Sequence, residues 1–388
     1  MNNDDKTINL WFPNLFDFKG GIQVYLLDVL KVIVENLPEF KIQVYNKLDQ
    51  GKKIENFCSY NNILFHFHGN VPNVLRTLIF TLSLLTSSLK KRPTLIVCGH
   101  INFAPVAYWV YRLTGTPYWI VVHGTDAWGI KDQIKQKALK TASKVISVSN
   151  YTRDRLLKEQ KLDPNQISLL PVTFDASRFE IAPKPKLLLE RYGLTLDQPT
   201  ILTVARLSRS DGYKGYDQVI KALPQIRQQI PNVHYLIVGK GDDRPRIEQL
   251  IQSLNLQDYV TLAGFIPDHE LVAHYNLCDV FAMPSKGEGF GIVYLEALAC
   301  GKPTLGGNQD GAIDALCHGQ LGALIDPDNI DVLAQTLIQI LQGTYPNQII
   351  YQPELLRQKV INIFGFAQFQ QTLIELLKQQ LTLTESLK

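Results

Sequence analysis

Residues 280–305 read VFAMPSKGEGFGIVYLEALACGKPTL, and their pattern indicates the fold class. It begins with a short apolar strand pattern, passes through a loop with three glycines, and continues as a helix predicted over Ile292–Cys300. Gly301 and Pro303 mark the end of that helix, and a second strand pattern follows at Thr304–Leu305. A strand, a crossing helix and a second strand of this kind predict a parallel sheet covered by helices.

The same alternation extends in both directions along the chain. Most of the predicted strands are continuous apolar runs, which is typical of parallel strands covered on both faces. In the first half they are Thr7–Phe12, Lys41–Tyr45, Ile63–Phe67, Leu95–Cys98, Trp119–Val122, Val145–Val148 and Ile167–Leu170. In the second half they are Ile201–Val204, Tyr235–Val238, Val260–Leu262, Val280–Ala282 and Thr304–Leu305. The fold class is therefore α/β, with two doubly wound domains.

Turn residues and charges interrupt the alternation between the two halves. We expect an N-terminal Rossmann-like domain over residues 1–172, a linker over 173–199 and a C-terminal Rossmann-like domain over 200–365. Residues 366–388 form a further helical segment. Its predicted helix, Ala367–Leu381, could cross back to brace the first domain.

Composition agrees with an ordinary globular protein of two domains. The chain has 388 residues, of which 45% are hydrophobic and 19% charged, which excludes disordered and fibrous classes. The segment Met1–Thr7 is polar and acidic, unlike a secretory signal, and the apolar stretch Val71–Leu89 is interrupted too often to span a membrane. Five scattered cysteines lack metal-ligand spacing and indicate free thiols in a reducing compartment. A cytoplasmic location is expected.

Charge is divided unequally between the halves. Residues 1–172 carry 21 Lys/Arg against 13 Asp/Glu, whereas residues 173–388 carry 18 against 23. The basic half predicts an anionic partner such as a membrane surface or a phosphorylated acceptor, or else an incidental solvated face. Lys90, Lys91 and Arg92 close an apolar, helix-like stretch, which is either a peripheral contact at the inner face of the membrane or a core helix with a basic cap. No nucleic-acid partner is expected.

The glycine-rich loop before the helix at Ile292 predicts an anion site. Such a loop presents free N–H groups and the positive end of the helix dipole, here near Phe290–Ile292. Glu296 lies just over one turn inside the helix, where it could accept hydrogen bonds from a ribose. Glu288 precedes the turn, at the entrance to the predicted anion site. The ligand-binding residues predicted here are Glu288, Gly289, Phe290, Gly291, Ile292 and Glu296. On spacing alone, a strand–loop–helix unit with two solvated glutamates remains the alternative.

The paired glutamates around Gly-Phe-Gly resemble the signature of retaining glycosyltransferase family 4, whose fold is called GT-B. The resemblance implies two facing Rossmann-like domains with the active site in the cleft between them. It implies transfer of a hexose-like sugar, with retained anomeric configuration, from a nucleoside diphosphate sugar to an acceptor hydroxyl. The acceptor would belong to polysaccharide, glycolipid or lipid-linked glycan assembly. No cofactor is expected besides the nucleotide-sugar co-substrate.

The resemblance also assigns a basic pair to the donor phosphates. In the family, an arginine and a lysine follow the first strand of the C-terminal domain, and here they match Arg206 and Lys214, with Arg209 as a rival for the lysine. Arginine grips a diphosphate bidentately, and lysine adds a compact charge. Together with His123 and Glu288, they are the expected catalytic residues.

The remaining matches are less specific. Gly20 and Gly21, after Lys19, correspond to a loop that approaches the donor phosphates, and His123 corresponds to a histidine that contacts the donor sugar. Gly239 would line the base pocket, and Phe265 would lie near the base. His100 and Asp126 are expected on the acceptor side.

Other interpretations of the sequence are a metal site, a dinucleotide-binding site and two functions other than sugar transfer. A metal site is not predicted, because Asp326–Asp328 lies in a late turn and Asp242–Asp243 adjoins arginines. A dinucleotide fingerprint after Gly239 fails at Arg244, which stands where the last glycine belongs. A nucleotide-sugar epimerase of the same fold, and a nucleotide-sugar-binding protein without turnover, remain as alternatives.

Overall fold

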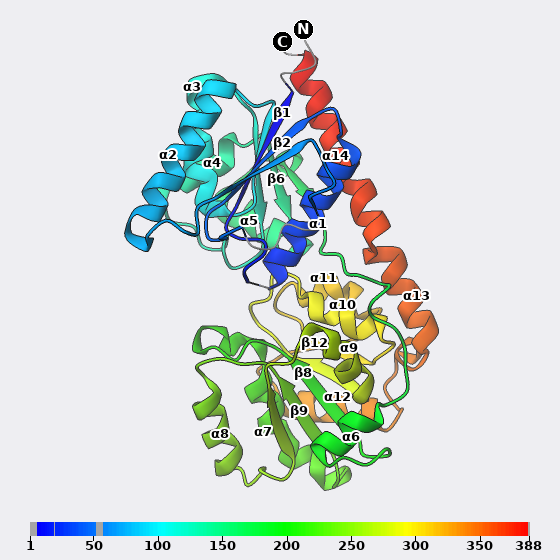
Figure 1. The fold of residues 1–388 in the computed structure, drawn as a ribbon. Helices are drawn as coiled ribbons and strands as arrows, with labels where there is room; N and C mark the ends of the chain where they lie inside the picture. Colours follow the sequence, from blue (N-terminus) through cyan, green and yellow to red (C-terminus); the bar gives the residue numbers. More distant parts are fainter. Residues whose placement is uncertain (1–5, 19, 52–56, 387–388) are drawn as a thin grey trace. The chain divides into compact units, whose positions relative to one another are not determined.

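The computed structural model describes residues 6–18, 20–51 and 57–386 and divides the chain into two compact units (Figure 1). Unit 1 comprises Met1–Val172 and Phe369–Lys388, and unit 2 comprises Thr173–Gln368. In the described residues each unit is built on one parallel sheet, so the α/β class predicted from the sequence is confirmed.

Unit 1 holds a seven-stranded sheet in the order β3-β2-β1-β4-β5-β6-β7, as far as the described residues show. Its strands are β1 (Thr7–Phe12), β2 (Lys41–Asn46), β3 (Ile63–Phe67), β4 (Leu95–Cys98), β5 (Tyr118–Val122), β6 (Lys144–Ser147) and β7 (Ile167–Leu169). Its helices are α1 (Gly21–Asn36), α2 (Asn73–Lys91), α3 (Ala104–Thr114), α4 (Gln133–Thr141) and α5 (Asn150–Gln160).

Unit 2 holds a six-stranded sheet in the order β10-β9-β8-β11-β12-β13. Its strands are β8 (Thr200–Val204), β9 (His234–Val238), β10 (Val260–Gly264), β11 (Val280–Met283), β12 (Thr304–Gly307) and β13 (Ala323–Ile325). Its helices are α6 (Lys186–Tyr192), α7 (Tyr216–Gln229), α8 (Arg244–Ser253), α9 (Asp268–Leu277), α10 (Ile292–Ala299), α11 (Ala312–Ala315), α12 (Ile330–Leu341) and α13 (Pro353–Phe364).

The strand predictions agree with the structure to within two residues at each end, and three features differ. β13 was not predicted, because three apolar residues between Gly322 and Asp326 give no usable periodicity. The stretch expected as a linker belongs to unit 2 and contains α6, which buries Leu188 and Leu189. The last helix, α14 (Phe366–Ser386), begins one residue earlier and ends five later than expected.

Helix α14 packs on unit 1, although it is far from the rest of that unit in sequence. The indole Nε1–H of Trp119 on β5 donates to Gln380 Oε1 at 3.0 Å. The rings of Tyr25 on α1 and Phe369 meet edge-on, with centroids 5.5 Å apart. On the same helix, Phe369, Leu373 and Leu377 are buried.

Strand order places a topological switch point in each sheet. In unit 2 the order reverses between β8 and β11, which are adjacent and parallel. In unit 1 it reverses between β1 and β4. Ligands of open α/β sheets bind outside the carboxyl ends of the strands at this point, so the loops after β8, β11, β1 and β4 are where a site is expected.

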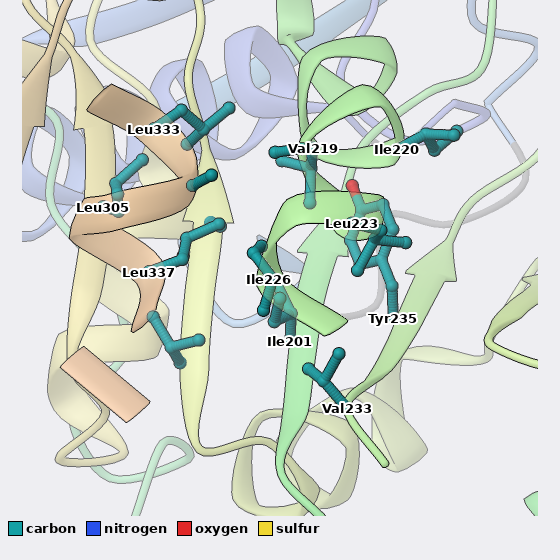
Figure 2. Close-up of a cluster of buried hydrophobic side chains, with 14 of the residues drawn as sticks. Ile201, Val219, Ile220, Leu223, Ile226, Val233, Tyr235, Leu305, Leu333 and Leu337 are labelled. Atoms are coloured by element: carbon teal, nitrogen blue, oxygen red, sulfur yellow. The ribbon is translucent and has the colours of Figure 1, made fainter. Parts of the chain in front are cut away.

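Packing between α7, α12 and the sheet forms the core of unit 2 (Figure 2). Val219, Leu223 and Ile226 recur on one face of α7 and are fully buried against Ile201 and Tyr235 of the sheet. Burying each aliphatic side chain contributes about 1.5–3 kcal/mol. The core therefore holds β8 rigidly and fixes the position of the loop that follows it.

Candidate active site

Two loops meet at the switch point of unit 2, one after β8 and one after β11. The first ends in a 3₁₀ helix, Arg209–Lys214, followed by Gly215 at φ +85°. A Cβ atom at Gly215 would lie 2.2 Å from the Pro284 carbonyl oxygen, and one at Gly287 would lie 2.9 Å from the Tyr213 ring. Glycines at both positions thus let the two loops touch.

Lys214 and Glu288, predicted for different parts of the donor, form an ion pair in the structure. The Lys214 ammonium contacts Glu288 Oε1, and only 18% and 12% of the two side chains are exposed. Burial lowers the pKa of Lys214 to about 8, while Asp211 and Asp310 oppose that shift. Lys214 is therefore still mostly cationic at pH 7.

The Lys214 ammonium also lies 5.2 Å from the centre of the Tyr213 ring. Arg209, its rival from the sequence, is exposed and uses its backbone N–H to bond Asp242 Oδ1 at 3.1 Å. The half-buried position of Lys214 next to the glycine-rich loop favours it over the exposed Arg209.

Arg206 lies just past the end of β8, as predicted. Its Nε–H donates to Asp211 Oδ2 at 2.5 Å, and this hydrogen bond raises the pKa of the guanidinium. Asp211 is buried, whereas 60% of the Arg206 side chain remains exposed. Asp211 therefore orients the guanidinium while leaving it accessible to a ligand.

The glycine-rich loop ends at the N-terminus of α10, which starts at the predicted residue, Ile292. Gly291 adopts φ +91° as the N-cap, and a Cβ there would lie 2.5 Å from the Tyr294 ring. No side chain caps this helix end, so its first amides, which have no intrahelical acceptor, can receive an anion. Phe290 packs edge-on against Phe364 at 5.4 Å, which anchors the loop.

Asp310 holds the glycine-rich loop through hydrogen bonds, and this role was not predicted from the sequence. Its carboxylate accepts hydrogen bonds from Ser285 Oγ at 2.7 Å, Glu288 N at 2.7 Å and Ala312 N at 2.9 Å. Burial raises the pKa of Asp310 to about 6. The available signal was the Asp310–Gly311 pair just after a strand end, where Gly311 allows the chain to approach Gly289.

Glu296 lies inside α10 and only 8% of the residue is exposed. Its Oε2 accepts a hydrogen bond from the Tyr275 hydroxyl at 2.6 Å, and burial raises the pKa of that hydroxyl. The structure thus gives this glutamate a protein partner that the sequence did not indicate.

Gly239 and Phe265 lie at the ends of β9 and β10. Gly239 adopts φ +145°, and a Cβ there would lie 1.8 Å from the Ala205 carbonyl oxygen, so only glycine fits beside the loop after β8. Phe265 is 65% exposed, and the Lys240 ammonium lies 4.8 Å from the centre of its ring. An exposed aromatic ring at a strand end is suited to stacking on a base.

Unit 1 gathers the other predicted residues after β1, β4 and β5. Gly20 is the N-cap of α1, with no side-chain cap, and Gly21 is its first residue. Lys19, which completes the predicted motif, lies outside the described residues.

His123 follows β5 and is held by two hydrogen bonds. Its backbone N–H donates to Asp126 Oδ1 at 2.9 Å, and its ring Nε2 lies 2.9 Å from the Gly99 carbonyl oxygen. Because a carbonyl only accepts, Nε2 carries the proton. Burial lowers the pKa of His123 to about 4, so Nδ1 is an acceptor at neutral pH. The Tyr25 ring meets this imidazole edge-on at 5.5 Å.

His100 and Asp126, both predicted for the acceptor side, interact electrostatically beside His123. Burial lowers the pKa of His100, and the Asp126 charge opposes that shift. His100 Nδ1 accepts a hydrogen bond from Asn102 N at 3.1 Å. Asp126 Oδ2 is buried with no hydrogen-bond partner among the described residues, and burial raises the pKa of this carboxyl to about 6.

The buried Asp126 carboxyl predicts a pH-dependent stability difference. Its pKa in the folded protein is above the ordinary 3.8, so the fold binds this proton more tightly than the unfolded chain does. Its contribution to stability is full below the ordinary pKa and is lost as pH rises through about 6. The melting temperature of wild type minus that of Asp126→Asn should fall between about pH 4 and pH 7. A constant or rising difference would contradict the raised pKa of this buried carboxyl.

Among the described residues, no group of three His, Cys, Asp or Glu side chains is arranged to hold a metal ion. In the same residues, no helix combines the length and the apolar character needed to cross a bilayer.

Comparison with known proteins agrees with this arrangement. Residues 19–178 match the family model Glycosyltransferase Family 4, and residues 188–353 match Glycosyl transferases group 1. The chain belongs to glycosyltransferase family 4. In this family 4 chain, the region matched by Glycosyl transferases group 1 contains Arg206, Lys214 and the glycine-rich loop.

Curated relatives of this family 4 protein include a mycobacterial enzyme. The GDP-mannose-dependent alpha-(1-6)-phosphatidylinositol monomannoside mannosyltransferase of Mycolicibacterium smegmatis is 34% identical over 209 residues, which are 52% of this chain and 53% of that protein. The alpha-D-kanosaminyltransferase of Streptomyces kanamyceticus is 25% identical over 63% of this chain and 65% of its own length. The chain thus spans about half the length of the first curated relatives it matches.

Solved structures resemble the family 4 chain over nearly its whole length. Sucrose-phosphate synthase from Thermosynechococcus elongatus gives a TM-score of 0.79 at 20% identity, covering 96% of this chain and 98% of that one. Anabaena HepE in complex with UDP and glucose gives 0.77 at 19% identity, covering 96% and 99%. The GT-B fold predicted from the sequence is confirmed.

Proposed function

We propose that the protein transfers a hexose-like sugar from a nucleoside diphosphate sugar to an acceptor hydroxyl with retention of anomeric configuration. The observation that carries the proposal is the cluster at the switch point of unit 2. There the loop after β8 carries Lys214 and the accessible guanidinium of Arg206, and the loop after β11, which meets it, leads into the uncapped end of α10.

The chemical need for this cluster lies in the leaving group. As the bond to the sugar breaks, negative charge grows on the diphosphate oxygen, and preorganised donors stabilise it without reorganising. In the proposed mechanism, Lys214 exchanges Glu288 for a phosphate oxygen when the donor binds. This exchange frees the Glu288 carboxylate to accept hydrogen bonds from hydroxyls of the transferred sugar.

His123 has a complementary role in the proposal. Its neutral Nδ1 is an acceptor, since Nε2 is committed to Gly99, so it can accept a hydrogen bond from a sugar hydroxyl. Glu288 is not assigned as a covalent nucleophile. We propose departure from the front face, with the diphosphate oxygen helping to deprotonate the acceptor.

Relatives guide the choice of the first substrates to test. Those that are 34% identical are named for GDP-mannose and a phosphatidylinositol mannoside, whereas HepE was solved with UDP and glucose. We therefore propose a glycolipid acceptor and GDP-mannose as the first donor to test, with UDP-glucose as the alternative.

Product analysis tests the proposal. The protein is incubated with each donor, with and without a membrane lipid extract as acceptor, and the products are identified by NMR of the anomeric proton. Acceptor-dependent formation of an α-glycoside from an α-linked donor is expected. Conversion of the donor without acceptor would instead indicate an epimerase, and binding without any turnover would indicate a non-catalytic nucleotide-sugar-binding protein.

We predict that this activity does not need a divalent metal. Two basic side chains and the α10 amides offset the charge of the diphosphate. Turnover should therefore survive excess chelator with little change. Complete loss of turnover, restored by Mg²⁺ or Mn²⁺ but not by Na⁺, would overturn the proposed phosphate site.

A further inference from the structure

Helix α2 contacts the body of unit 1 through a narrow stripe. Its buried side chains are Phe80, Leu84 and Ser88, which recur every four residues and therefore lie on one line along the helix. A helix that covers a sheet normally buries a wider apolar face than this. Most of the α2 surface thus remains outside the core.

Leucines occupy much of that remaining surface. Leu75, Leu78, Leu82 and Leu89 are 48%, 58%, 49% and 41% exposed. Together with the half-buried Leu85 they are spaced three and four residues apart, which places them on one continuous face. Exposed apolar patches of this kind mark interaction surfaces.

Helix α3 extends the apolar surface beside α2 (Figure 1). Trp109 is 52% exposed and Leu113 is 65% exposed. Between the two helices lies a groove of about 350 Å³ whose lining includes Leu85, Leu89, Trp109 and Leu113 and no charged side chain. We call these exposed apolar residues of both helices the α2–α3 surface.

Charge around the α2–α3 surface has one sign. Residues 57–125 contain five Lys or Arg and no Asp or Glu. Lys90 and Lys91 are exposed in the last turn of α2, Arg92 is its exposed C-cap, and Arg112 is exposed on α3. An apolar face on two helices that carry cations and no carboxylate is complementary to an anionic lipid leaflet, where cations meet headgroups and apolar side chains reach the acyl boundary.

We infer that the α2–α3 surface docks on an anionic lipid bilayer, lying in its interface without crossing it. A second copy of this chain fits less well, because the same cations would face one another with no acidic residue of this segment between them. The inference deepens the proposed function and rests on it in one respect, since it brings the protein to the surface where a glycolipid acceptor would lie.

Binding to vesicles tests this docking directly. The full chain is mixed with vesicles of phosphatidylcholine alone or of phosphatidylcholine with phosphatidylglycerol, and the bound fraction is measured by co-sedimentation at low and high salt. Binding should require phosphatidylglycerol and weaken with salt, because the cations act through a screened attraction.

Two variants separate the charged and apolar contributions. Lys90→Glu/Lys91→Glu should weaken binding at least about 25-fold, since each cation near an anionic surface contributes about fivefold. Leu78→Gln/Leu82→Gln should weaken it at least about tenfold through lost apolar burial, while glutamine keeps a good helix propensity. Arg92 is left unchanged, because its left-handed conformation, φ +45°, makes a substitution there ambiguous.

Matched controls carry the same substitutions elsewhere. Lys158→Glu/Lys378→Glu changes two exposed lysines on α5 and α14, and Leu187→Gln/Leu355→Gln changes two exposed leucines of unit 2. Both controls should bind vesicles like wild type. All four variants should keep the melting temperature and the stabilisation by nucleoside diphosphates, so a failure of docking is distinguishable from a failure of the nucleotide site.

Three results of the vesicle assay would overturn the inference. They are equal binding to neutral and anionic vesicles, no binding to either, and equal losses in the variants and their controls. A concentration-dependent dimer that Leu78→Gln/Leu82→Gln dissociates would assign the surface to a second copy instead.

Discussion

Replacing Lys214 with alanine is expected to weaken nucleoside diphosphate binding by on the order of ten- to a hundredfold, because a charge-assisted contact contributes ~1.5–3 kcal/mol. The loss of turnover should be larger, about a hundred- to a thousandfold, because the charge on the diphosphate grows in the transition state. Calorimetric titration and initial rates measure the two quantities.

Two further variants serve as controls for Lys214→Ala, one at Arg209 in the same loop and one at Glu288, the ion-pair partner of Lys214. Arg209→Ala removes the exposed rival and should leave affinity and rate within about twofold of wild type. Since Lys214→Ala also leaves Glu288 half-buried and unpaired, the double variant with Glu288→Gln separates lost stability from lost binding. Wild-type affinity and rate in Lys214→Ala, with a loss in Arg209→Ala, would transfer the phosphate role to Arg209.

Alanine substitutions of the two glutamates in the glycine-rich segment should impair different properties, nucleotide affinity in one variant and turnover in the other. Glu296→Ala should weaken binding of the bare nucleoside diphosphate about ten- to a hundredfold, because its proposed partner is the ribose. Glu288→Ala should leave that affinity nearly intact and lower turnover by at least about a hundredfold, because its proposed partner is the transferred sugar.

Tyr275→Phe is the control for Glu296. It removes the hydroxyl that donates to Oε2 and leaves the carboxylate in place. If Glu296 acts on the ribose, the phenylalanine variant keeps most of the nucleotide affinity. Equal losses of nucleotide affinity in the Glu288 and Glu296 variants would contradict the assigned roles.

Much of the fold was predictable because it depends on local patterns. Continuous apolar runs predicted the strands, and the glycines and Pro303 that flank α10 predicted its start at Ile292 and its end to within one residue. β13 and α6 were missed because three and seven residues are too few for periodicity to decide.

Contacts between loops could not be predicted in the same way. The Lys214–Glu288 pair depends on how the 3₁₀ helix meets the glycine-rich loop, which Gly215 and Gly287 decide by close approach. Asp310 was missed for a related reason, since its hydrogen bonds join it to residues up to 25 positions earlier. The exposure of the α2 leucines could not be predicted either. A leucine-rich helix has the same sequence pattern whether its apolar face is buried in the core or exposed to solvent.

The phosphate site is tested by calorimetric titration with a nucleoside, its monophosphate and its diphosphate in the presence of a chelator. If Arg206, Lys214 and the α10 amides hold the diphosphate without a metal, the diphosphate binds at least about a hundredfold more tightly than the nucleoside, and Lys214→Ala removes most of that advantage. Equal affinity for all three compounds, or an advantage that disappears with the chelator alone, would contradict the account.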